Sequence, residues 1–330
     1  MQCNTLRCHR RRLGSKVQDR RRDSFTSGEP SICLPSNKIM AAISAFPSLE
    51  TYHVNTKAAK TSNYPWIAQV VHSRTAEIPH MCTAVCIDEA IYITAARCVY
   101  TLKVKHTTIL HMFKKFEALA FVLPSEPTKQ MFDDIGIIVV DKNEKNAKRV
   151  KNWATIGLFN RFNRTDDMFK WSVKLNTNVG KRDYKVVGYA LKKGLHNLRA
   201  AEIKFELREL NVIVSHDICF KILQQYNRLG DGFKVPCYYT CTFKQYSKNK
   251  SNCNNYLGVE GAALIEIGET NKLVGVATWG AYYKRFELPV GFSVVNSINF
   301  FKDLSCARRI RGDKSNNIKK GYYQNLCDTL

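Results

Sequence analysis

The segment Ala90–Cys98 has the sequence AIYITAARC and begins with a short run of β-branched and aromatic residues. Such runs, bounded by turn residues, are typical of β-strands. Four others lie elsewhere in the chain: Trp66–Val71, Ile135–Val140, Tyr184–Tyr189 and Leu273–Trp279. Many short strands at irregular spacing predict an all-β fold, either a barrel or a sandwich.

The periodicity changes near the C-terminus. Apolar residues there recur at steps of three and four, at Val294, Val295, Ile298, Phe301 and Leu304. This spacing predicts one amphipathic helix over about residues 293–304, ending before Cys306.

The length and composition set the domain organisation. The chain has 330 residues, of which 45% are hydrophobic, enough to bury two sizeable cores. A Lys- and Asn-rich break over 141–153 separates two strand-rich halves, predicted as a first barrel over about 64–145 and a second over about 153–292. Residues 1–50 are predicted to be a disordered basic tail or a wrongly assigned start, and residues 306–330 a basic tail.

The chain is strongly basic, with 51 Lys and Arg against 28 Asp and Glu and a net charge of +23. Acidic partners or anionic surfaces would be attracted to it. Basic residues cluster three times, at Lys103, Lys105, Lys114 and Lys115, over residues 142–151 and over residues 244–250. Such runs are usually solvated basic faces, which is the first interpretation; an anionic glycan or another acidic surface as a partner is the alternative. No nucleic-acid-binding motif accompanies the charge, and no apolar run reaches the roughly 18 residues of a membrane span.

The cysteine content indicates an oxidising compartment. Twelve cysteines in a globular chain suggest disulfides, which form outside the cell. Glycosylation sequons at Asn163 and Asn249 point the same way. We therefore expect a secreted protein, although no convincing signal peptide follows Met1.

Three segments, in this order, resemble the trypsin and chymotrypsin-like serine protease family. The segment Ile93–Cys98 (ITAARC) is similar to T-A-A-H-C, and Asp134–Ile137 (DIGI) is similar to D-I-A-L. The segment Gly258–Leu264 (GVEGAAL), followed by Leu273–Gly280 (LVGVATWG), is similar to G-D-S-G-G-P-L and L-V-G-I-x-S-W-G. The resemblance implies two six-stranded antiparallel β-barrels with a C-terminal helix, over residues 51–305.

The three segments depart from the family at the catalytic positions. The family's triad needs a hydroxyl nucleophile, an imidazole base and a carboxylate that orients the imidazole. The base position here holds Arg97, whose guanidinium cannot accept a proton, and the nucleophile position holds Glu260. Only Asp134 is kept. The oxyanion-hole donors would be the backbone amides of Gly258 and Glu260, beside a carboxylate that opposes an oxyanion.

The resemblance and these departures together imply a catalytically inactive homologue. Such homologues act as binding or regulatory proteins in extracellular proteolytic cascades, with proteases or their substrates as partners. No cofactor is expected. The alternatives are an active serine endopeptidase with an unidentified nucleophile and a basic module that binds anionic glycans.

The replacements suggest an ionic network in the former cleft. If Arg97, Asp134 and Glu260 converge there, one cation lies between two carboxylates, an arrangement that makes buried charges tolerable. The alternative is that Arg97 and Glu260 turn outward to water, where ion pairs contribute little.

The resemblance also implies disulfides. It pairs Cys82 with Cys98, and Cys219 with Cys237 or Cys241, which leaves the other for Cys253. Cys86 and Cys306 form a further candidate pair. Cys237, Cys241 and Cys253 as zinc ligands are less expected, because structural zinc takes four ligands, so no metal is predicted. The histidines His106 and His111 are expected at the surface.

Overall fold

The structure, a computed structural model, describes part of the chain. The described residues are 57–72, 80–100, 102–124, 134–141, 150, 153–159, 170, 183–191, 205–215, 239–244, 260–279, 282–283, 286–287, 290–312 and 321–323. All of them belong to one compact unit, Pro35–Leu330. The expected N-terminal tail, residues 1–50, lies outside the described residues. No helix among the described residues is long and apolar enough to cross a membrane.

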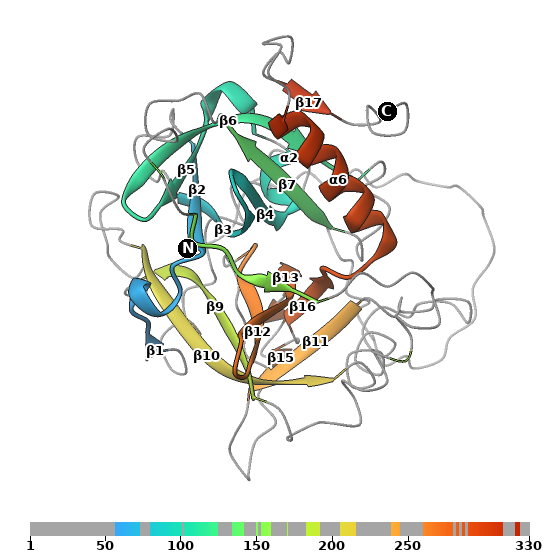
Figure 1. Ribbon diagram of the computed structural model, residues 1–330. Coiled ribbons are helices and arrows are strands. Elements are labelled where there is room, and N and C mark those ends of the chain that lie inside the picture. Colours follow the sequence, from blue (N-terminus) through green and yellow to red (C-terminus); the bar gives the residue numbers. More distant parts are fainter. Residues whose placement is uncertain are drawn as a thin grey trace, which may run out of the picture. The chain divides into compact units, whose positions relative to one another are not determined.

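Six antiparallel strands form a closed first barrel. They pair in the order β6-β5-β2-β3-β4-β7, and β7 returns to β6 (Figure 1). Their bounds are β2 (Ile67–His72), β3 (His80–Asp88), β4 (Ile91–Ala95), β5 (Thr107–His111), β6 (Lys114–Val122) and β7 (Ile135–Val140). The predicted all-β fold and the first barrel are confirmed.

A second antiparallel sheet follows. Its long strands pair in the order β10-β11-β16-β13-β12-β9, and β10 also pairs with β9. Their bounds are β9 (Asp183–Leu191), β10 (Phe205–Ser215), β11 (Tyr239–Lys244), β12 (Ala263–Ile267), β13 (Lys272–Trp279) and β16 (Val290–Val294). The short strands β1 (Lys57–Ala58) and β8 (Gly157–Leu158) pair with β10 and β13, and β14 (Tyr282–Tyr283) pairs with β15 (Phe286–Glu287).

The two sheets share one hydrophobic core. Ile93 and Ile137 of the first barrel pack in the same cluster as Val187 and Val276 of the second sheet and Leu304 of the C-terminal helix, and all five are buried. Burying each such side chain stabilises the fold by about 1.5–3 kcal/mol. This shared core holds in place the loops between the sheets, where the candidate site lies.

The C-terminal helix α6 differs from the prediction of 293–304, because it spans Ile298–Gly312. Val294 belongs to β16, and the Ser297 Oγ accepts a hydrogen bond from the Phe300 N–H at 3.0 Å, an N-terminal cap that sets where the helix begins. The apolar face continues past the expected end through Cys306, Ala307 and Ile310, all buried.

The region predicted as a basic C-terminal tail, 306–330, is partly built into the fold. Arg308 and Arg311 of α6 each donate to the Asp88 carboxylate at 2.7 Å. The strand β17 (Gly321–Tyr323) pairs in parallel with β6. The basic composition therefore reflects, in part, ion pairs between α6 and the end of β3.

The prediction that His111 lies at the surface is wrong. His111 is 2% exposed inside the first barrel and stacks on Trp153. Its Nε2 lies 2.6 Å from the Pro65 carbonyl and its Nδ1 lies 2.8 Å from the Tyr92 hydroxyl. Because a carbonyl only accepts, Nε2 carries the proton and Nδ1 accepts from Tyr92. The ring therefore fits this site in its neutral form.

The candidate pair Cys86 and Cys306 is also wrong. Cys86 is a buried free thiol on β3, and its Sγ donates to the Asp88 carbonyl at 3.4 Å. Cys306 is bonded in a disulfide, which therefore does not include Cys86.

Protonation of His111 should destabilise the fold. Burial lowers the pKa of His111 below its ordinary 6.5, so at mildly acidic pH the unfolded chain binds a proton that the folded chain excludes. We expect wild type to lose more thermal stability between about pH 7.5 and about pH 5 than His111→Gln does. Melting followed by circular dichroism at both pH values checks this. Equal losses in the two proteins would contradict it.

Candidate functional site

Two adjacent segments position Arg97 and Asp134, which the sequence predicts at triad positions. The short helix α2 (Ala96–Tyr100) follows β4 directly and carries Arg97, and Asp134 immediately precedes β7. The strands β4 and β7 pair with Ala95 opposite Ile135, which brings α2 beside Asp134. A Cβ at Gly136 would lie 3.0 Å from the Ala96 Cα, so glycine lets α2 pack against β7.

Arg97 and Asp134 form an ion pair. The Arg97 Nε donates to the Asp134 Oδ2 at 2.6 Å, and the Arg97 backbone N–H donates to the Oδ1 at 3.1 Å. The Asp134 side chain is 3% exposed and the Arg97 side chain is 31% exposed. Both carboxylate oxygens of Asp134 therefore accept from Arg97, Oδ2 from the guanidinium and Oδ1 from the backbone N–H.

Asp134 is also tied to the second sheet. Its backbone N–H donates to the Ser293 Oγ of β16 at 3.2 Å, and that hydroxyl donates to the Thr278 Oγ1 of β13 at 3.3 Å. Both hydroxyl residues are buried. We did not identify Ser293 or Thr278 as site residues from the sequence, although polar side chains inside apolar strands were a usable signal.

The backbone at Glu260 is fixed by β3 and β13. The Glu260 carbonyl accepts from the Thr83 N–H at 2.9 Å, and the Gly261 N–H donates to the Ala277 carbonyl at 2.7 Å. Gly261 has φ +80°, and a Cβ there would lie 1.9 Å from the Thr83 carbonyl oxygen. Only glycine satisfies both constraints, which explains why Gly261 follows Glu260.

The Glu260 carboxylate lies in a buried environment. Its Oε2 is inaccessible and has no hydrogen-bond partner among the described residues. Burial raises the pKa of Glu260 to about 7, while the charge of Arg97 lowers it and the charge of Asp134 raises it further. The Glu260 backbone N–H also bonds to this carboxylate. The carboxylate is therefore close to both members of the ion pair.

A disulfide lies beside this carboxylate. Cys82 of β3 and Cys98 of α2 are bonded to each other, and both Sγ atoms lie within 4.8 Å of a Glu260 carboxylate oxygen. Disulfide sulfurs are not thiolates, so this group is not a thiolate ligand set for a metal.

The remaining predicted site residues are not described. Cys219, Cys237, Cys253, Gly258, Asn163 and Asn249 lie outside the described residues. Cys241 lies in β11, and its side chain is not described.

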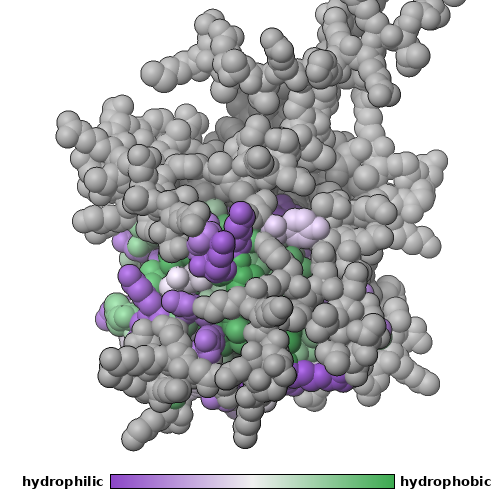
Figure 2. Space-filling view, turned by 90° about the horizontal axis from the view of Figure 1, so that it is seen from above, coloured by the Kyte–Doolittle hydropathy of each residue, from purple (hydrophilic) through white to green (hydrophobic). Residues whose placement is uncertain are grey.

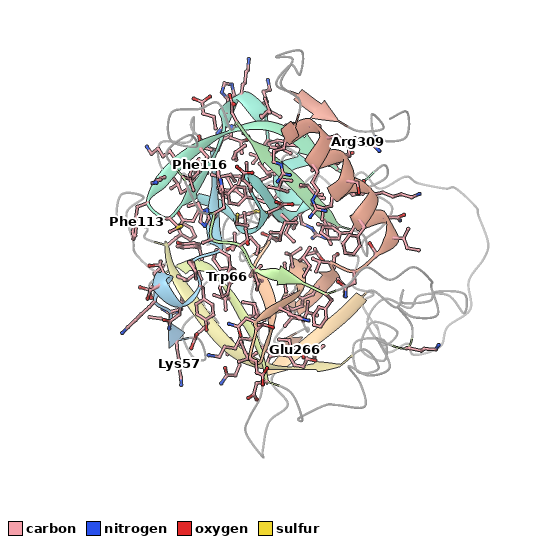
Figure 3. The ribbon with its side chains drawn as sticks, viewed as in Figure 1. Lys57, Trp66, Phe113, Phe116, Glu266 and Arg309 are labelled. Atoms are coloured by element: carbon pink, nitrogen blue, oxygen red, sulfur yellow. A yellow bond between two sulfur atoms is a disulfide. The ribbon has the colours of Figure 1, made fainter. Side chains whose placement is uncertain are left out.

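Removing the guanidinium should destabilise the fold, because Asp134 would remain buried without it. We expect Arg97→Ala to lower the free energy of unfolding by about 1–3 kcal/mol, and the exposed Arg309→Ala of α6 to change it little (Figure 3). Chemical denaturation measures both. In a double-mutant cycle, Asp134→Asn should show coupling with Arg97→Ala. A melting curve for Arg97→Ala that matches wild type would remove the ion pair as a stabilising interaction.

Glu260 should make the fold less stable as pH rises. The pKa of Glu260 is raised from its ordinary 4.5 to about 7, so between these pH values the folded chain holds a proton that the unfolded chain releases. The stability that this proton contributes is therefore fully present below pH 4.5 and lost above pH 7. We expect Glu260→Gln to be more stable than wild type at about pH 8, by at most about 3 kcal/mol. The gain should vanish at about pH 4. The exposed Glu269→Gln is the matched control, and an equal gain at both pH values would count against the assignment.

Comparisons with known proteins identify the family and the fold. The family model Trypsin matches residues 53–299. The crystal structure of the scabies mite inactivated protease paralogue S-D1 is similar, with a TM-score of 0.55 and 17% identity, covering 78% of this chain and 98% of that one. At this identity the likeness shows the fold. No curated protein that was compared matches the chain. Since the family model spans most of the chain, the chain belongs to the trypsin family.

Proposed function

We propose that this trypsin-family chain has lost peptidase activity and acts by binding, as a regulatory protein in an extracellular proteolytic cascade. By family the chain falls in the class of serine-type endopeptidases. The observation that carries the proposal is the Arg97–Asp134 ion pair. It occupies the carboxylate that, in an active triad, orients the general base.

The base is the first group that is missing. General-base catalysis requires a side chain that can take a proton near neutral pH, and an arginine stays protonated in proteins. Its pairing with a carboxylate that is 3% exposed stabilises the charged form further. Arg97 therefore cannot activate a nucleophile.

The nucleophile and the oxyanion site are altered at the same residue. Glu260 has no hydroxyl for acyl transfer, and its backbone N–H, an oxyanion donor in the family, bonds to its own carboxylate. When ionised, this carboxylate would repel the negative charge that develops on a tetrahedral intermediate. Each change alone removes most catalysis, and the two act on the same step.

The remaining structure supports a binding role. The core shared by the two sheets and the backbone hydrogen bonds at Glu260 and Gly261 maintain the fold without the catalytic groups. The Cys82–Cys98 disulfide supports secretion into an oxidising compartment. The partner on this proposal is another protein of the cascade, a protease or its substrate.

Labelling with a fluorophosphonate probe, which reacts with activated serines, tests the loss of activity. We expect trypsin to be labelled and this protein to remain unlabelled. An Arg97→His, Glu260→Ser double variant, which restores both missing side chains, is treated in parallel. Covalent labelling of the wild type that survives denaturation would show that a serine is activated, and the proposal would be abandoned.

A further inference from the structure

The hairpin between β5 and β6 has an unusual turn. His111 pairs with Lys114, so Met112 and Phe113 alone form the loop. Their φ angles are 48° and 62°. Positive φ at both positions is typical of a type I′ turn, which strongly prefers Asn-Gly because side chains are strained in this region. Here both positions carry large apolar side chains.

Packing within the chain does not compensate for this strain. Phe113 is 96% exposed and Met112 is 52% exposed, and they are the exposed large hydrophobic residues of the described part of the chain. Phe116, three residues later, is 1% exposed inside the barrel, whereas Phe113 points away from it (Figure 3). Strain combined with an exposed aromatic ring indicates a contact outside the chain.

The residues that follow the turn in the chain are basic. Lys114 and Lys115 begin β6 and are exposed. Lys103 and Lys105 are also exposed, at the short helix η2 (Val104–His106), which contacts β6. On the side where Figure 3 places Phe113, Figure 2 shows hydrophobic and hydrophilic residues next to one another at the edge of the described surface. The hairpin therefore presents an apolar tip with positive charge behind it.

The tip stands on a rigid base. His111, the last residue before the turn, is buried and bonded to Pro65 and Tyr92. The two apolar side chains are therefore held outward by the barrel, so little conformational entropy would be lost when they bind.

We propose that this hairpin docks the protein on an anionic lipid surface. Met112 and Phe113 enter the boundary between headgroups and acyl chains, and Lys114 and Lys115 contact anionic headgroups. A bilayer carries its anionic headgroups at the surface and its apolar acyl chains beneath them. This order matches the hairpin, whose lysines would meet the headgroups while its apolar tip reaches the acyl chains. An anionic glycan would satisfy the lysines but would not bury Phe113. The proposal uses no residue of the former catalytic cleft, so it stands independently of the proposed function.

Vesicle sedimentation tests the proposal on the full chain. Vesicles of phosphatidylcholine containing phosphatidylserine are compared with vesicles of phosphatidylcholine alone. The variants are Phe113→Ala, Phe113→Trp, and Met112→Asn with Phe113→Gly. The last pair installs the preferred turn residues, so it should melt at a higher temperature than wild type. Loss of binding in this variant would therefore not reflect unfolding.

We expect wild type and Phe113→Trp to bind the anionic vesicles. Phe113→Ala and the Asn-Gly variant should bind them at least about tenfold more weakly, because an apolar anchor is lost. Retention on immobilised heparin should be the same for all four. Wild type that binds heparin but neither vesicle would make a glycan the ligand and overturn the proposal. The proposal would also be overturned if Phe113→Ala and the Asn-Gly variant bound the anionic vesicles as tightly as wild type does. Equal binding of wild type to both vesicle types would overturn it as well.

Discussion

The buried carboxylate of Asp134 is the group on which the rest of the site depends. A carboxylate removed from water must be neutralised or hydrogen-bonded, otherwise its burial costs several kcal/mol. Arg97 meets this need through its Nε and its backbone N–H, both on α2. The backbone of Asp134 is in turn held by Ala96 and Ser293. One acidic residue thus joins α2, β7 and β16.

Several contacts hold the backbone around Glu260 in place. They are the tight turn at Gly261, the hydrogen bond of the Glu260 carbonyl to Thr83 and the Cys82–Cys98 disulfide. The Thr83 hydroxyl also accepts from the Tyr189 N–H, so β3 is bonded to both β9 and the start of β12. These contacts join the two sheets. These contacts stabilise the fold whether or not the site transfers protons.

Much of the fold and part of the site could be predicted from local sequence. Runs of β-branched residues correctly located β2, β4, β7, β9 and β13, and the motifs around Arg97, Asp134 and Glu260 identified three residues that lie close together. The start of α6 was missed although its cap at Ser297 is a local signal. Its end was missed because the ion pairs of Arg308 and Arg311 with Asp88 join residues far apart in the chain. The burial of His111 was missed because its hydrogen-bond partners, Tyr92 and Pro65, lie far from it in the chain and meet it only in the folded barrel.

The sequence by itself determined the fold class, the family resemblance and the residue types at the predicted triad positions, because each depends on residue types at fixed local spacing. Tertiary structure decided the charge states and contacts. It set the depth at which Glu260 is buried, the pairing of Arg97 with Asp134 and the free thiol at Cys86. It also placed Phe113 in water and Phe116 in the core, three residues apart. Desolvation and hydrogen bonding depend on distances between segments far apart in the sequence, and only the folded chain sets those distances.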